Sequence, residues 1–300
     1  MVSVIIPTHN RADFLKSSIA SVLSQTYGDF EIIVVDDNSS DHTHEVIKGI
    51  KDNRIKYIRH RENRGPSAAR NTAIASATGE YIAFLDDDDE WIPEKLQKQV
   101  GLLDKSKSNI CAIYSNRMVV DKLSNQIISK SPQAKKLKGN LLYQLSVGSP
   151  IHTSTVIIKK KCIEKIGLFD ESMSYMEDRD FWIRLSLNWD FEYIDTPLTI
   201  AYVHKQGHLS ESLEGQTGGR EKLLERYNDL FSTDRKTWSK LHLIQGAQYC
   251  QLKNMKKGRK NLLKGIKIYP FNLKAYLHLF SSLLGPTAYQ CLRKSFKTST

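Results

Sequence analysis

Strand-like and helix-like segments alternate over the first 85 residues, and this alternation limits the fold more than any other feature of the sequence. Four segments read as strands: VSVIIP (2–7), FEIIVVDD (30–37), IKYIRH (55–60) and YIAFL (81–85). Three stretches between them predict helices: residues 11–26, 41–51 and 67–78. Strands that alternate with helices are typical of an α/β layer with a largely parallel sheet.

Polar side chains follow three of these strands at the point where each ends. They are Pro7-Thr8-His9-Asn10, Asp36-Asp37-Asn38 and Asp86 to Asp89. Ligands of such sheets collect beyond the carboxyl ends of the strands. We therefore expect the three clusters to converge on one crevice.

The run Asp86 to Glu90 places five carboxylates next to one another. Acidic residues at a helix N-terminus complement the helix dipole, which accounts for Asp89 and Glu90 if a helix begins at Trp91-Ile92-Pro93-Glu94. It does not account for Asp86 and Asp87, which directly follow the strand. Like charges this close raise each other's pKa unless a cation neutralises them. The run therefore favours a binding site for Mg²⁺ or Mn²⁺. Such an ion is coordinated by one or two protein carboxylates and also by substrate phosphates.

The rest of the chain is less regular. It predicts a strand (153–160), a short helix ending at Gly167, a helix (176–187), two short strands around Pro197 (191–204), a Gly-rich linker entering a helix (215–230), and two or three amphipathic helices after residue 240.

The net charge of +11 is concentrated at the C-terminal end of the 300-residue chain. Residues 235–300 hold fourteen of the 44 basic residues and no acidic residue, which leaves 30 basic against 33 acidic residues in 1–234. A charge asymmetry of this kind indicates two functional parts. The basic tail suits contact with an anionic membrane surface, and it equally suits ordinary solvated helices.

Several classes of protein are disfavoured. No C-x-x-C pair, no G-x-G-x-x-G after a strand and no G-x-x-x-x-G-K occurs. No signal peptide and no window of about 18 apolar residues is found. We therefore expect a cytoplasmic protein, held peripherally at the inner face of the cell membrane if the tail contacts lipid.

The segments 2–41 and 63–96 resemble family 2 glycosyltransferases, which have the GT-A fold. The resemblance is most specific over residues 1–100 and continues through IHTSTVIIKKKCIEKIGLFDE and MEDRDFWIRL to about residue 210. It implies a mixed, mainly parallel sheet flanked by helices. The implied domains are a catalytic domain (1–215), with a nucleotide-sugar half (1–100) and an acceptor half (101–215), and a linker helix with a basic helical tail (216–300).

The resemblance also implies roles for individual residues. The nucleotide-sugar-binding residues are Pro7, Thr8, Asn10, Asp37, Asn63, Arg70, Asp86 and Asp87. Asp88 matches the metal-binding position of the family's D-x-D element, with Asp86 and His204 as further candidate ligands. Since the acidic run extends to Asp89, the position of the carboxylate that contacts the metal directly stays open by one residue.

Glu177 and Asp178 resemble the family's E-D-x-D-x-W element, in which the aspartate is the general base. That role maps to Asp178. A sugar hydroxyl that attacks an anomeric carbon must lose its proton, and a positioned carboxylate accelerates this step about 10²–10⁴-fold. The alternative is an acidic helix start with an Asp180–Arg184 pair, worth about 0.3–0.5 kcal/mol.

Taken with the resemblance, these residues predict an inverting glycosyltransferase of class EC 2.4 in bacterial surface polysaccharide synthesis. It would use a nucleotide-diphosphate sugar, most simply a UDP-sugar, with Mn²⁺ or Mg²⁺, and a glycan or lipid-linked acceptor. Two alternatives stay open. A sugar-nucleotide nucleotidyltransferase would need a Gly-rich triphosphate loop, which PTHNRAD lacks. A non-catalytic scaffold or nucleic-acid-binding protein could use the basic tail, although no nucleic-acid recognition motif accompanies it and we expect no nucleic-acid partner.

Overall fold

The structure, a computed structural model, describes residues 1–124, 126–130, 138–148, 150–203 and 212–296. The chain forms two compact units. The sheet unit comprises residues 1–145, 149–173 and 177–207, and the helical unit comprises residues 146–148, 174–176 and 208–300. The predicted boundary at residues 215 and 216 stays a prediction. The predicted metal ligand His204 lies outside the described residues.

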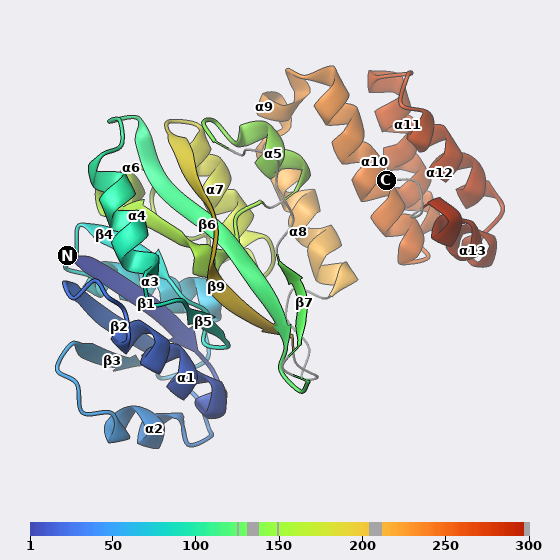
Figure 1. Cartoon of the computed structure of the whole chain (residues 1–300). Helices are drawn as coiled ribbons and strands as arrows, with labels where there is room; N and C mark the ends of the chain where they lie inside the picture. The colour runs from blue at the N-terminus through green and yellow to red at the C-terminus, as the bar shows by residue number, and fades with distance from the viewer. Residues whose placement is uncertain (125, 131–137, 149, 204–211, 297–300) are drawn as a thin grey trace. The chain divides into compact units, whose positions relative to one another are not determined.

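One mixed sheet organises the sheet unit (Figure 1). Its described strands are β1 (Val2–Thr8), β2 (Phe30–Asp36), β3 (Ile55–Arg59), β4 (Tyr81–Phe84), β5 (Asp89–Trp91), β6 (Ile110–Asp121), β7 (Ile127–Lys130), β8 (Val156–Lys159) and β9 (Asp190–Val203). The order is β3-β2-β1-β4-β8-β6-β9-β5, and β7 pairs with β6. The first four strands are parallel, as the sequence predicts, whereas β8 runs antiparallel to both β4 and β6.

Helices connect these strands. They are α1 (Ala12–Leu23), α2 (Thr43–Gly49), α3 (Pro66–Ser76), α4 (Lys95–Asp104), α5 (Leu142–Val147), η1 (Thr153–Thr155), α6 (Lys160–Ile166) and α7 (Glu177–Ser186). α1 forms because Leu15, Ile19 and Val22 recur at helical spacing and are fully buried. They pack in one core with Val4 and Ile6 of β1. α6 ends where Gly167 adopts φ 82°, a left-handed conformation that favours glycine.

Three sequence-based predictions of local structure are wrong. No helix begins at Trp91, because residues 89–91 form β5 and pair with β9, and α4 begins only at Lys95. Residues 190–203 form one strand rather than two, and the register with β6 shifts near Pro197. The glycines of residues 215–219 do not form a linker, because they lie inside α8 (Leu213–Arg226). A Cβ on Gly215 would lie 2.2 Å from the Tyr175 ring, so a close packing contact accounts for that glycine.

The helical unit contains α8 and a run of further helices: α9 (Asn228–Ser232), α10 (Arg235–Gln251), α11 (Met255–Ile268), α12 (Leu273–Leu283) and α13 (Pro286–Phe296). Asp234 caps α10, accepting from the Lys236 N–H at 3.0 Å. α10 and α11 approach closely at Gly258, where a Cβ would lie 2.3 Å from the sulfur of Cys250. Among the helices that the structure describes, none is both long enough and apolar enough to cross a bilayer.

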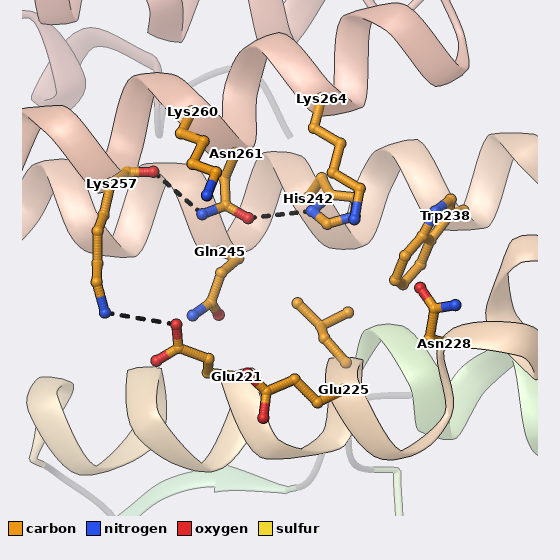
Figure 2. Close-up of a pocket in the computed structure, with 11 residues that line it drawn as sticks. Glu221, Glu225, Asn228, Trp238, His242, Gln245, Lys257, Lys260, Asn261 and Lys264 are labelled. Carbon is orange, nitrogen blue, oxygen red and sulfur yellow. Dashed lines mark hydrogen bonds and ion pairs between the residues drawn. The ribbon is translucent and has the colours of Figure 1, made fainter.

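A cavity of about 560 Å³ lies among α8, α10 and α11 (Figure 2). Lys257 of α11 forms an ion pair across it with Glu221 of α8, at 3.5 Å. The side-chain oxygen of Asn261 accepts from Nδ1 of His242 at 3.0 Å. None of the residues that line it is a predicted site residue, and the predicted site residues that the structure describes lie in the sheet unit.

Candidate active site

The turn after β4 carries the acidic run and lies at the carboxyl ends of the parallel strands. β1 pairs with β2 on one side and with β4 on the other, so the chain segments after all three strands meet at one edge. There the Thr8 hydroxyl donates to Asp87 at 2.7 Å, and the Asp37 N–H donates to the Thr8 carbonyl at 2.8 Å. The structure thus brings together residues from the three polar clusters.

Arg11 holds two members of the acidic run. Its guanidinium donates to Asp87 at 3.3 Å and also pairs with Asp88. Burial raises the pKa of Asp87 to about 7, although Arg11 and the Thr8 hydroxyl act in the opposite direction. Arg11 therefore contacts two buried carboxylates at this edge.

Asp86, Asp89 and His152 form a second group, in which one ligand atom from each residue lies within 4.8 Å of the others. Ser154 orders this group, because its hydroxyl accepts from the Asp86 N–H at 3.1 Å and donates to Asp89. Burial, with Asp86 and Asp88 nearby, raises the pKa of Asp89 well above its usual value. Carboxylate and imidazole ligands suit a divalent cation such as Mn²⁺.

His152 is available for such a role. Its Nδ1 is buried and has no hydrogen-bond partner, and it lies 3.7 Å from the Asp89 carboxylate. Burial and the nearby Arg117 lower the pKa of His152 to about 4, so the imidazole is neutral at pH 7, the form that binds metals. The donor set and the unpartnered nitrogen therefore fit a divalent metal ion.

Arg70 joins the acidic run to the predicted base. It is buried in α3 and donates to Asp86 at 3.0 Å and to Glu177 of α7 at 3.2 Å. Burial alone would raise the pKa of Asp86, but Arg70 keeps it below its ordinary value. Burial and the adjacent Asp178 raise the pKa of Glu177 to about 7, and burial also raises the pKa of Asp178.

Asp37 holds the loop that precedes α3. Its carboxylate accepts from the N–H groups of Arg64, at 2.9 Å, and Gly65, at 2.6 Å, and lies 2.7 Å from Nδ1 of His60. The Asn63 side chain accepts from the Gly65 N–H at 3.2 Å. These contacts position the loop, and the predicted contacts of Asp37 and Asn63 with a nucleotide stay predictions.

Pro7 and Asn10 lie on either side of Thr8 and His9 at the end of β1. Asn10 has φ 53° and its side-chain oxygen accepts from the Ser40 N–H at 2.7 Å, which ties this turn to the segment after β2. Their predicted roles in nucleotide-sugar binding stay predictions.

The profile of glycosyl transferase family 2 matches residues 3–165, more than half of the chain. The chain belongs to glycosyl transferase family 2. It is 32% identical over 251 residues to the uncharacterized glycosyltransferase RP339 of Rickettsia prowazekii, which covers 81% of this chain and 74% of that protein. It is therefore a glycosyltransferase of class EC 2.4, as the sequence predicts.

Two further proteins extend the comparison of this family 2 enzyme. One is the Escherichia coli UDP-Glc:alpha-D-GlcNAc-diphosphoundecaprenol beta-1,3-glucosyltransferase WfgD, 34% identical over 188 residues, covering 62% of this chain and 69% of WfgD. The other is S. aureus TarS 1-349 in complex with UDP-GlcNAc, which has a TM-score of 0.66 at 20% identity and covers 100% of this chain and 92% of that chain. The chain spans 49% of the longer TarS chain. At this identity TarS supports the fold alone, and the predicted GT-A type fold is confirmed.

Sequence reasoning missed several residues of this family 2 site. They are Arg11, His152 and Ser154, which no local pattern marks, whereas the sequence leaves Asp89 open as a metal ligand because the acidic run extends to it. His152 stands at the start of IHTSTVIIKK, the segment in which the family resemblance weakens. The contact of Asp86 with Ser154 spans 68 residues, so local patterns could not reveal it.

Proposed function

We propose that this enzyme moves a sugar from a UDP-linked donor to a hydroxyl of a lipid-linked saccharide, with inversion at the anomeric carbon. The observation that carries the proposal is the arrangement around Arg70. This guanidinium contacts both Asp86 of the acidic run and Glu177 beside the predicted base. A donor-binding edge and a proton acceptor would then share one buried cation.

The donor assignment rests on the edge formed by β1, β2 and β4. We assign the donor to Pro7, Thr8, Asn10, Asp37, Asn63, Arg70, Asp86 and Asp87. The TarS structure was solved with UDP-GlcNAc, which supports a uridine nucleotide as the first donor to test. The sugar itself is left to experiment.

Asp86, Asp89 and His152 would hold Mn²⁺ or Mg²⁺, since their ligand atoms lie within 4.8 Å of one another. Asp88, the ligand that the resemblance implies, is paired with Arg11 in this structure, and its binding to metal would require that pair to open. The chemistry that the ion supplies when bound is neutralisation of the charge on the leaving diphosphate.

Asp178 would accept the proton of the acceptor hydroxyl. The hydroxyl oxygen forms a bond to the anomeric carbon, the bond from that carbon to the diphosphate oxygen breaks, and its electron pair leaves with the nucleoside diphosphate. A buried carboxylate with a raised pKa is a stronger base than an exposed one, and burial raises the pKa of Asp178. Glu177, held by Arg70, would position this part of α7.

The acceptor assignment rests on WfgD, whose name states a diphosphoundecaprenol-linked GlcNAc acceptor. A lipid-linked acceptor lies in a membrane, and the fourteen basic residues of 235–300 suit contact with its anionic inner face. We therefore propose that the enzyme works at the cytoplasmic surface of the cell membrane, which it contacts peripherally.

The test is a transfer assay with a panel of labelled nucleotide sugars and detergent-dispersed diphosphoundecaprenol-GlcNAc. We expect transfer from a UDP-sugar into the lipid fraction, with a product anomer opposite to that of the donor. In the Asp178→Asn variant, transfer should fall by at least about 10²-fold while UDP binding stays within twofold. Retention of the donor anomer, or full activity of Asp178→Asn, would contradict the proposal.

A further inference from the structure

The helix α12 is built the opposite way round from an ordinary surface helix. The side chains that it buries are small or polar, namely Ala275, Ser281 and Ser282. Leu279 packs partly buried against the core of this unit, but the other large apolar side chains are exposed: Leu273 is 74% exposed and Phe280 is 65% exposed. A surface helix normally turns its apolar stripe toward the core and its polar side toward water.

The exposed apolar side chains form one continuous stripe. Leu273, Leu277, Phe280 and Leu284 follow one another at spacings of four, three and four residues. With Tyr276 and Leu283 they fall within an arc of about 120° on a helix of 3.6 residues per turn. Phe271, just before the helix, is 79% exposed. We call these seven residues the α12 face. Scattered exposed apolar residues are normal, but a contiguous stripe marks an interaction surface.

The charges around the α12 face indicate what covers it. Residues 235–300 contain fourteen lysines and arginines and no aspartate or glutamate. Lys267 and Lys274, which flank the start of α12, are exposed. A second copy of the same surface would bring like charges together, which disfavours association. An anionic phospholipid surface complements the charge and accepts apolar side chains at the same time.

We infer that the α12 face inserts into the interfacial layer of an anionic phospholipid bilayer and that the surrounding lysines bind its headgroups. α12 has 11 residues and is about 16 Å long at 1.5 Å per residue, so it would lie in the plane of the membrane. This inference rests on the proposed membrane contact and deepens it, because it names the surface and adds an apolar contribution that charge alone does not supply.

Vesicle flotation tests the inference. The full chain is mixed with vesicles of phosphatidylcholine alone or of phosphatidylcholine and phosphatidylglycerol in equal parts. We expect binding to the anionic vesicles, and we expect part of it to persist at about 0.5 M NaCl, because salt screens headgroup charges but not apolar insertion. The partition coefficient of the double variant Leu277→Ser, Phe280→Ser into anionic vesicles should fall by at least about tenfold.

A matched control separates this surface from apolar exposure in general. The double variant Leu123→Ser, Leu187→Ser removes exposed apolar side chains from the sheet unit and should bind as the unsubstituted chain does. Melting curves should show that both variants fold. Unchanged binding of the α12 variant, binding that vanishes entirely with salt, or dimerisation through the α12 face in sedimentation without lipid binding would each overturn the inference.

The same variants distinguish this inference from the transferase proposal. With detergent-dispersed acceptor, the α12 variant should keep its transfer rate, since no substituted residue lies in the candidate active site. Vesicle binding without any sugar transfer would contradict the transferase proposal and leave the membrane surface standing.

Discussion

At the scale of single residues, two guanidinium groups contact the carboxylates of the candidate active site, that of the partly exposed Arg11 and that of the buried Arg70. Arg11 forms ion pairs with Asp87 and Asp88, and Arg70 forms ion pairs with Asp86 and Glu177. A guanidinium presents several N–H groups in a fixed plane and can contact two carboxylates at once, whereas an ammonium group is a point charge.

Replacing Arg70 with lysine tests this bridging role. The Arg70→Lys variant keeps the charge but cannot span both Asp86 and Glu177, so kcat/KM should fall by at least about tenfold. Arg54→Lys is the matched control, because Arg54 pairs with Asp52 near the surface at 2.7 Å. The control should retain activity within about twofold. Equal activity of the two variants would show that Arg70 supplies only charge.

His242 gives the helical unit a specific pH dependence. Burial lowers the pKa of His242 to about 4, with Lys264 contributing in the same direction and Asn261 opposing. The unfolded chain binds a proton near pH 6.5 that the folded chain takes up only near pH 4. This histidine therefore lowers the free energy of unfolding as the pH falls from about 6.5 to 4.

The His242→Gln variant should lose less stability than the unsubstituted chain between pH 7 and pH 4.5, as thermal melting in that range would measure. His42→Gln, at an exposed histidine, is the control for replacing a histidine by glutamine. Parallel profiles for His242→Gln and the unsubstituted chain would contradict the assignment.

At the scale of elements, strand and helix periodicity predicts the first half of the sheet well. β1 to β4 and α1 to α3 follow from apolar runs and helical spacing. Apolar side chains of the four strands, α1 and α2 meet in one core. β5 could not be predicted, because the three residues Asp89–Trp91 become a strand only through pairing with β9, which lies more than 100 residues later. The sequence predicts the later part of α8 but not its start, because the glycines there are typical of a linker, whereas Gly215 and Gly219 pack closely against Tyr175.

Close packing of α10 on α11 gives a test at this scale. The Gly258→Ala variant would place a Cβ 2.3 Å from the Cys250 sulfur and 3.1 Å from the Gly246 carbonyl oxygen, so the Cys250 side chain or the two helices must shift. We expect a loss of about 1–3 kcal/mol in the free energy of unfolding, measured by denaturant titration.

Gly218→Ala is the matched control, because Gly218 lies within α8 and nothing stands within 4 Å of its added Cβ. The free energy of unfolding of the control should rise by up to about 1 kcal/mol, because alanine has a higher helix propensity than glycine. A Gly258→Ala variant as stable as the control would contradict the observed packing.

At the scale of the whole molecule, the sequence predicts a catalytic part and a basic helical part. The charge asymmetry is plain in the sequence, whereas the exposure of the α12 face is not, because apolar spacing alone cannot show which side of a helix is covered. The acidic run is equally plain, but its grouping with His152 and Ser154 required the folded chain.

Titration of UDP into the chelator-treated full chain, with and without Mn²⁺, tests whether a metal ion at the acidic run contributes to donor binding. Because Asp86, Asp89 and His152 would hold the ion that faces the diphosphate, we expect UDP to bind at least about tenfold more tightly with Mn²⁺, and the Asp86→Asn variant to lose this gain. Calorimetry that finds the same UDP affinity with and without Mn²⁺, or the same gain in Asp86→Asn, would contradict the account.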